Sequence, residues 1–337
     1  LQIAFWVLEK IAGPPDMSPH ITEFPFFTFL FADLHPHMMV IPFTLLVIGL
    51  GLNLVVGFSG QSKGWIAAAS VALAMALGAL WVVNSWDYPS YMLLALVLVG
   101  LAVYFRRGAT KSKIVMMALI SAGVVAVSLL AFWPFHQSYE AFNAGLDVSK
   151  WRTPIDRYLV IHGLFLFIAA TYLIVQTAGP LRGMFRPGGD SALQGKTPKW
   201  ILGMGILAVA MLLLLNYWTA AMLAGFLTLT ALAFWMAVRL ARQERHFESV
   251  SLVLLAMALA IGLGVDFVRI EGDIGRMNTL FKYYLEIWVL FSVASAYMVW
   301  RLLAESSLAQ GSTEPNRNTV WGRPSWPKAA WVPVLAL

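Results

Sequence analysis

Residues 38–58 read MMVIPFTLLVIGLGLNLVVGF, a run of 21 residues that contains no charged side chain. About 20 apolar residues are enough for a helix to cross the hydrocarbon core of a bilayer. Eight further apolar runs follow, at about 65–83, 88–105, 114–133, 158–178, 200–217, 218–238, 249–268 and 282–303. The sequence therefore predicts an all-α, polytopic integral membrane protein with about nine complete membrane-spanning helices.

The composition of the 337-residue chain agrees with a membrane protein and excludes several kinds of chemistry. Hydrophobic residues make up 60% of the chain and charged residues 12%. Because there is no cysteine, the chain has no disulfide, no thiolate metal site and no cysteine nucleophile. Its sequence also lacks a Walker loop, a Gly-x-Ser-x-Gly elbow and a His-Glu-x-x-His motif. We expect membrane lipids as partners and no nucleic acid.

The two ends of the sequence both lie in apolar stretches, at residues 1–8 and 329–337. We therefore expect this chain to be part of a larger protein. Residues 1–37 are predicted to hold the end of a preceding span and an outer loop, and residues 38–303 the nine-helix domain. A cytoplasmic linker at 304–328 and the start of a further span at 329–337 complete the predicted organisation.

Alternation of the nine spans divides the loops into two sets, and the basic residues are shared unevenly between them. One set holds 16 of the 23 lysines and arginines. By the positive-inside rule, that set is predicted to face the cytoplasm. Twelve of the 17 acidic residues and five of the six histidines lie in the other set or at the span ends that face it. We therefore expect the functional groups at the outer face.

The segment that enters the first complete span is rich in acidic, histidine and aromatic side chains. From Glu23 to His37 it reads EFPFFTFLFADLHPH. A low dielectric at the membrane boundary raises the pKa of a carboxyl group, which would suit Asp33, together with Glu23, to act as a general base. Two alternatives remain open. Asp33 caps the following helix, or Asp33, His35 and His37 bind a divalent metal ion.

The short outer segment at residues 84–89 reads NSWDYP and combines turn-forming residues with interfacial aromatic side chains. A tight turn between two spans is the simpler interpretation. The carboxyl group of Asp87 and the indole of Trp86 are also candidates for contact with a substrate at the membrane surface. The longer outer connection at 132–157 fits either a half-buried lid or a solvated connector.

Three basic residues, Arg269, Arg276 and Lys282, lie at the predicted outer face against the positive-inside bias. Binding of a lipid phosphate would explain them, because arginine gives bidentate contacts and lysine a point charge. Internal ion pairs are the alternative, since Asp273 follows Arg269, and Glu286 follows Lys282, at i,i+4 spacing.

The interiors of the predicted spans hold few polar groups. Asn53 and Gln176 are the main polar exceptions, and the ionisable residues Asp266, Glu286 and His162 lie nearer the outer ends. Transporters usually keep ionisable groups near the midplane of the membrane, so this pattern disfavours transport. Glycine pairs at 49/51 and 262/264 predict close packing between helices.

Four ordered blocks of the sequence carry a resemblance to a known family. They read FPFFTFLFADLHPHMMVIPF, NSWDYPSYMLL, TPIDRYLVIHGLFLF and RMNTLFKYYLEIWVLFSVASAY. These blocks are similar to those of the YYY membrane proteins, an uncharacterised prokaryotic family of multi-span proteins, over about residues 21–300. The tyrosine triplet that names the family is not present in this chain. The resemblance implies a location in the prokaryotic plasma membrane.

That family in turn resembles the glycosyltransferase-C superfamily, whose members transfer sugars from polyprenyl-phosphate carriers. The resemblance implies a glycosyltransferase-C-like fold in which Asp33 takes the proton of the acceptor. The residues then expected to stabilise the departing lipid phosphate are Arg276, Lys282 and Arg269. The residues expected to orient the site or to hold a metal ion are Glu23, His35 and His37.

We therefore expect a membrane glycosyltransferase that moves a sugar from a polyprenyl-phosphate donor to an acceptor at the outer face. A non-catalytic subunit that docks a protein partner in a membrane complex is the alternative. A transporter, with a path past Asn53 or Gln176, is the third hypothesis. A lipid-shaped cavity that leads to the acidic loop would favour the enzyme, because a scaffold has no need for one.

Overall fold

The computed structural model describes residues 24–31, 34–106, 109–140, 145–149, 153–184, 197–214, 218–241, 243–271, 273 and 276–308. Two predicted catalytic residues, Asp33 and Glu23, lie outside these residues. The apolar segments predicted at 1–8 and 329–337 also lie outside them.

The predicted spans coincide with long helices in the part of the chain that the structure describes. These helices are α4 (Ile41–Gly57), α5 (Lys63–Val83), α6 (Tyr88–Phe105), α7 (Thr110–Leu130), α9 (Ile155–Met184), α10 (Thr197–Leu214), α11 (Trp218–Ala241), α12 (His246–Phe267) and α13 (Met277–Leu308). Seven of the described spans are long and apolar enough to cross a membrane, and α11 contributes a shorter apolar stretch, Ala224–Leu240. The prediction of an all-α polytopic membrane protein is confirmed.

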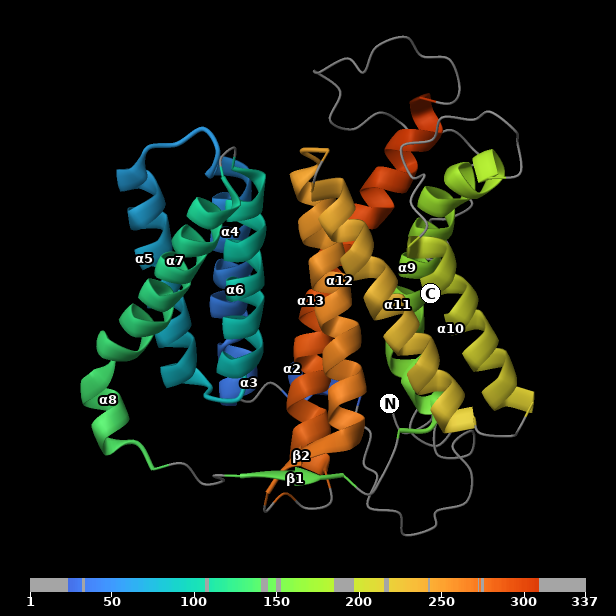
Figure 1. The fold of residues 1–337 in the computed structure, drawn as a ribbon. Coiled ribbons are helices and arrows are strands. Elements are labelled where there is room, and N and C mark those ends of the chain that lie inside the picture. Colours follow the sequence, from blue (N-terminus) through green and yellow to red (C-terminus); the bar gives the residue numbers. More distant parts are fainter. Residues whose placement is uncertain are drawn as a thin grey trace.

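Several short elements gather at one end of the bundle, which we call the β end (Figure 1). They are α2 (Phe27–Phe31), α3 (Pro36–Met39), α8 (Trp133–Ser138), β1 (Leu146–Val148) and β2 (Val268–Ile270). The two strands pair antiparallel, with Asp147 opposite Arg269. They were not predicted, because three residues are too few for an alternating pattern to be recognised. The opposite end, where α5 and α7 begin and α13 ends, is called the basic end.

Helices α12 and α13 lie at the centre of the bundle, between helices α4 to α7 on one side and α9, α10 and α11 on the other (Figure 1). Helix α12 packs against α11 and α13 and also touches α4 and α6. Accordingly, 67% of the most apolar 18-residue stretch of α12 is buried, against 11% of the corresponding stretch of α7. Helix α7 thus packs mainly against α5 and α6 and leaves most of its surface open.

The two glycine pairs only partly behave as predicted. A Cβ atom at Gly262 would lie 2.5 Å from the hydroxyl of Tyr158, and one at Gly51 would overlap the side chain of Leu98. Helices approach closely at these two positions, as expected for small residues in membrane bundles. A Cβ atom at Gly49 or Gly264 would meet nothing within 4 Å. One glycine of each pair therefore serves packing.

Replacement of Gly262 by alanine is expected to lower the melting temperature of the purified protein. The side chain of Tyr158 is buried, with its ring centroid 4.6 Å from those of both Phe226 and His162, so it has little freedom to move away. Such overpacking typically costs about 1–3 kcal/mol. Gly264→Ala, two residues away on the same helix, is the matched control and is expected to be neutral or slightly stabilising. Equal melting temperatures for the two variants would contradict this account of the packing.

Candidate functional site

A small polar cavity lies at the β end, where α3, α4, the turn before α6 and α13 meet. We call it the Asp87 pocket. Its lining consists of His37, Val40, Ile41, Thr44, Asp87, Tyr91, Lys282, Leu285, Glu286 and Val289. Its volume is about 10 Å³, roughly the space that one water molecule requires. Ionisable groups from distant parts of the sequence thus converge on one enclosed point.

Asp87 occupies the N-cap position of α6 but does not cap that helix with its side chain. Its carboxyl group accepts a hydrogen bond from the side-chain amide of Asn84 and lies within hydrogen-bonding reach of the Glu286 carboxyl. The side chain is 4% exposed. Burial raises the pKa of Asp87 to about 6, although the contacts with Glu286 and Asn84 and the charge of Lys282 act in the opposite direction. Asp87 therefore changes its charge near pH 6.

Glu286 supplies the second carboxyl group of the pocket from within α13. It follows Met277, the first residue of that helix, by nine positions, or roughly 13 Å along the axis. The side chain is 3% exposed, and neither carboxyl oxygen has a hydrogen bond of ordinary geometry to a described group. Two adjacent carboxylates repel each other in a low dielectric, and one proton held between them removes that repulsion.

Lys282 brings a positive charge to the rim of the pocket. Its ammonium group lies 3.8 Å from the centroid of the Trp86 ring, a cation–π contact, and the Trp86 ring lies 6.3 Å from that of Tyr283. The anticipated ion pair with Glu286 is not formed, since Lys282 has no carboxylate within 4 Å among the described residues. The structure does bring together three predicted substrate-binding residues, Trp86, Asp87 and Lys282.

The two histidines of the predicted metal site lie beside the pocket. His37 is buried, with its Nε2 atom 3.4 Å from the hydroxyl of Thr28 and its ring 4.6 Å from that of Phe281. His35 is exposed, and its ring lies 5.3 Å from that of His37. The described residues alone contain no group of three or more His, Asp or Glu side chains placed to hold a metal ion. Since Asp33 lies outside those residues, the metal site stays a prediction.

Arg276 does not line the Asp87 pocket. Its guanidinium, 1% exposed, donates to the Asp266 carboxylate at 2.5 Å, to the Val265 carbonyl at 3.0 Å and to the Thr153 hydroxyl at 2.9 Å. The Thr153 hydroxyl is also 2.8 Å from that of Tyr284. Arg276 is thus enclosed in an internal ion pair that ties α12 and α13 to the start of α9, and no open phosphate site is formed around it.

Arg269 is held by a carboxylate across the strand pair. Its Nη2 atom lies 2.6 Å, and its Nε atom 3.0 Å, from one oxygen of Asp147. The anticipated partner, Asp273, instead accepts hydrogen bonds from the backbone of Asn278 and from Thr279 at the start of α13. Arg269 therefore forms an internal ion pair, as the alternative prediction had it, but with Asp147 in place of Asp273. Strand β1, which lies in the connection at 132–157, is therefore held to β2 by this ion pair as well as by the strand pairing.

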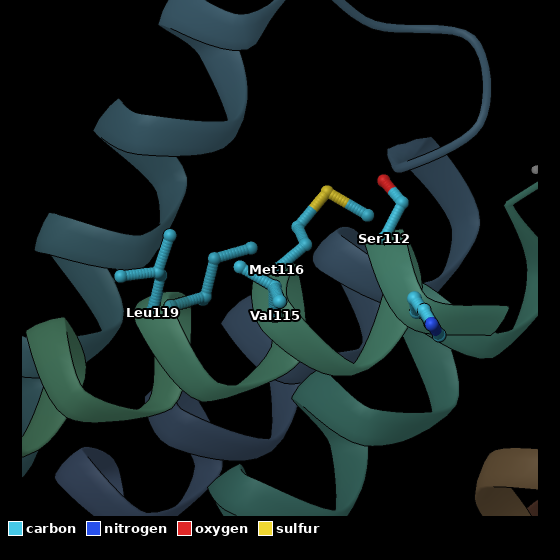
Figure 2. Close-up of a pocket in the computed structure, with 6 residues that line it drawn as sticks. Ser112, Val115, Met116 and Leu119 are labelled. Atoms are coloured by element: carbon cyan, nitrogen blue, oxygen red, sulfur yellow. The ribbon is translucent and has the colours of Figure 1, made fainter. Parts of the chain in front are cut away.

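A larger hollow, of about 500 Å³, lies away from this site on the exposed side of α7, where Ser112, Val115, Met116 and Leu119 project from one face of the helix (Figure 2). Lys111 is the one charged residue in its lining. A mostly apolar hollow at the basic end offers no acid–base chemistry, so the Asp87 pocket is the better candidate for a reactive site.

The sequence did contain a signal for Glu286 and Asp266, the two carboxylates that complete these clusters. An ionisable residue inside an apolar span is a candidate functional residue by default, because its burial is costly. Their positions near the outer ends of spans were noted, but not their partners. The pairing of Glu286 with Asp87 depends on contacts across 199 positions of sequence, which periodicity does not report.

The raised pKa of Asp87 makes the stability of the protein depend on pH. A carboxyl group whose pKa is higher in the folded than in the unfolded state favours folding while it is protonated. That contribution is lost as the pH rises from the unfolded value of 3.8 to about 6. We expect the melting temperature of the wild type to fall over this range. Asp87→Asn is expected to flatten that fall, and an unaltered pH profile in this variant would contradict the burial of a titrating Asp87.

The two arginine clusters are expected to differ strongly in their contributions to stability. Arg276→Gln leaves the carboxylate of Asp266 buried without its partner, which typically costs about 3–5 kcal/mol. Arg269→Gln removes an ion pair in which Asp147 is 46% exposed, and the expected cost is about 1 kcal/mol or less. Chemical denaturation of both variants measures the difference. Similar losses in the two variants would show that Arg276 is not enclosed as described.

Comparison with known proteins is consistent with the helical architecture and leaves the chemistry open. Neither the curated proteins nor the solved structures gave a match to this chain. Residues 8–291 match the model of the family described as "Uncharacterized membrane protein (DUF2298)". Since the match covers most of the 337 residues, the chain belongs to this family of uncharacterised membrane proteins.

Proposed function

We propose that this protein is a membrane glycosyltransferase that moves a sugar from a polyprenyl-phosphate donor to an acceptor at the β end of the bundle. One observation carries the proposal. A buried carboxyl group whose pKa is raised to about 6, that of Asp87, lies in the same pocket as the ammonium group of Lys282. The expectation drawn from the sequence resemblance to glycosyltransferase-C enzymes points to the same reaction, as an analogy.

The position of the pocket suits a lipid-borne donor. Asp87 immediately precedes the apolar span that begins at Tyr88, so its carboxyl group is at the boundary between the membrane and water. The phosphate of a polyprenyl carrier lies at that boundary while its chain stays in the hydrocarbon. A lysine held against an aromatic ring, as Lys282 is on Trp86, offers a point charge to such a phosphate.

The proposed reaction is a displacement at the anomeric carbon of the sugar. The carboxylate of Asp87 takes the proton of an acceptor hydroxyl, and the acceptor oxygen forms a bond to that carbon. The bond between the anomeric carbon and the phosphate oxygen breaks, and polyprenyl phosphate leaves with its electron pair. Lys282 stabilises the negative charge that remains on the phosphate. Asp33 and Glu23 stay additional candidates for the base.

Donor binding requires the pocket to open, since about 10 Å³ has no room for a sugar phosphate. We expect the Lys282 side chain to move when the pocket opens. Its cation–π contact with Trp86 contributes only about 0.5–2 kcal/mol, so a contact with the donor phosphate can replace it. Lys282 would then move from the indole to the donor.

The test is transfer from a radiolabelled polyprenyl-phosphate hexose in membranes that contain the full-length protein. Asp87→Asn is expected to lower kcat by a factor of about 10²–10⁴, the usual contribution of a general base. Lys282→Gln is expected to raise the KM for the donor by a factor of about 10–100, the usual worth of a hydrogen bond to a charged group.

Asp147→Asn is the matched control, because it removes a half-exposed carboxylate at the same end but outside the pocket. It is expected to retain wild-type turnover. Absence of any transfer by the folded wild type would refute the proposed function. Loss of transfer in Asp33→Asn but not in Asp87→Asn would keep the function and move the base to Asp33.

A proton-coupled transporter is the second candidate, and the depth of Glu286 in its span favours it. Carboxyl groups buried inside membrane spans are typical of proton relays. Proton uptake by liposomes containing the purified protein separates the two functions. Uptake that Glu286→Gln abolishes, without any sugar transfer by the wild type, would favour transport.

A further inference from the structure

Two hollows join into one groove along α7. The first, of about 500 Å³, is the one in Figure 2, and the second, of about 340 Å³, lies between α5 and α7. Leu119 and Ile120 line both hollows, so the two hollows adjoin along α7. We call this surface the α7 groove. Beyond these two residues it continues along α7 to Gly123, Val124 and Val127, opposite Ile66 and Ala67 of α5.

The shape and chemistry of the groove suit a single extended apolar chain. Its residues on α7 run from Lys111 to Val127, which is roughly 24 Å along the helix. The hydrocarbon core of a bilayer is about 30 Å thick, so the groove crosses more than one leaflet. Apart from the lysines and two serines at 70 and 112, its lining is apolar. An acyl chain from the leaflet at the basic end fits within this length.

One end of the groove carries positive charge that this half of the protein does not neutralise. Lys63 and Lys111 line the groove at the start of α5 and α7, and both lie at the basic end. Between residues 34 and 139 the sequence contains one acidic residue, Asp87, and it lies at the β end. Neither lysine has a carboxylate within 4 Å in the described part of the chain.

Two further cations near the same end are also paired with neutral groups. Arg106 donates to the sulfur of Met116 at 3.0 Å, and Lys113 donates to the carbonyl of Tyr104 at 2.9 Å. Neither contact cancels the positive charge. The end of the groove at the starts of α5 and α7 is therefore a site of positive potential next to a long apolar surface, a combination that matches an anionic head group with an attached hydrocarbon chain.

We propose that the α7 groove binds an anionic glycerophospholipid, with an acyl chain along α7 and the head-group phosphate at the end of the groove that carries Lys63 and Lys111. The Ser112 hydroxyl, which also lines this end, donates to a head-group oxygen. This site goes beyond the proposed transfer reaction and does not depend on it, since it lies at the opposite end from Asp87. The lysine pair makes it selective for anionic over zwitterionic head groups.

The test measures retention of phosphatidylglycerol and phosphatidylcholine by the full-length protein, using native mass spectrometry in detergent. Phosphatidylglycerol is expected to bind more tightly. Each lysine near an anionic head group contributes binding free energy that corresponds to about a fivefold change in affinity. Lys63→Gln or Lys111→Gln is therefore expected to weaken binding about fivefold, and the double variant about 25-fold. Arg239→Gln, which removes a cation from the last turn of α11 at the same end, is the matched control and is expected to bind normally.

A second pair of variants tests the apolar part of the groove without changing charge. A Cβ atom at Gly123 meets no atom within 4 Å, so Gly123→Leu is expected to fold and to narrow the groove, and its melting temperature is measured as a check on folding. This variant is expected to weaken binding of phosphatidylglycerol, whereas Gly49→Leu, at an equally open position on α4, is expected to have no effect.

Equal retention of the two lipids, or unchanged binding by the double lysine variant, would overturn the proposal. Displacement of phosphatidylglycerol by a lower concentration of polyprenyl phosphate would also overturn it, because the groove would then belong to the donor lipid. A protein subunit that copurifies with the wild type and is lost in Gly123→Leu would assign the groove to a partner helix instead.

Discussion

The cost of taking charge out of water is the constraint on which this structure depends. Helix α13 and the residue just before it carry three ionisable side chains into the bundle at the β end, and each meets a partner from another element. Arg276 pairs with Asp266 of α12, Lys282 lies on the ring of Trp86, and Glu286 lies beside Asp87. The need to satisfy these groups joins α13 to α12 and to the turn between α5 and α6.

The two ends of the bundle treat their charges differently. At the β end, Arg276 and Arg269 are matched by carboxylates from other elements. At the basic end of helices α4 to α7, lysines and arginines have no acidic counterpart within residues 34–139, where the one acidic residue, Asp87, lies at the β end. Internal neutralisation suits an enclosed site whose groups must keep their positions, whereas uncompensated charge suits contact with an anionic molecule at the membrane surface.

The spans were predictable because each is a long apolar run, and length in a bilayer is set by the thickness of the hydrocarbon core. Trp86, Asp87 and Lys282 were named from sequence as candidate binding residues, but not as neighbours. The role of Glu286 and the pairing of β1 with β2 were not predicted, since both arise from contacts between segments more than 100 residues apart. The predicted catalytic residues Asp33 and Glu23 lie outside the described part of the chain and stay predictions.

The central claim is that the carboxyl groups of Asp87 and Glu286, from distant elements, lie side by side in one buried pocket. A double-mutant cycle on stability at pH 8, with Asp87→Asn, Glu286→Gln and the double variant, tests it most directly. Because the two carboxyl groups share one proton, either substitution disturbs the same contact, and we predict a coupling free energy of at least about 1 kcal/mol, so that the effect of the double variant differs from the sum of the two single effects by that amount. Additive effects of the two substitutions would contradict the claim.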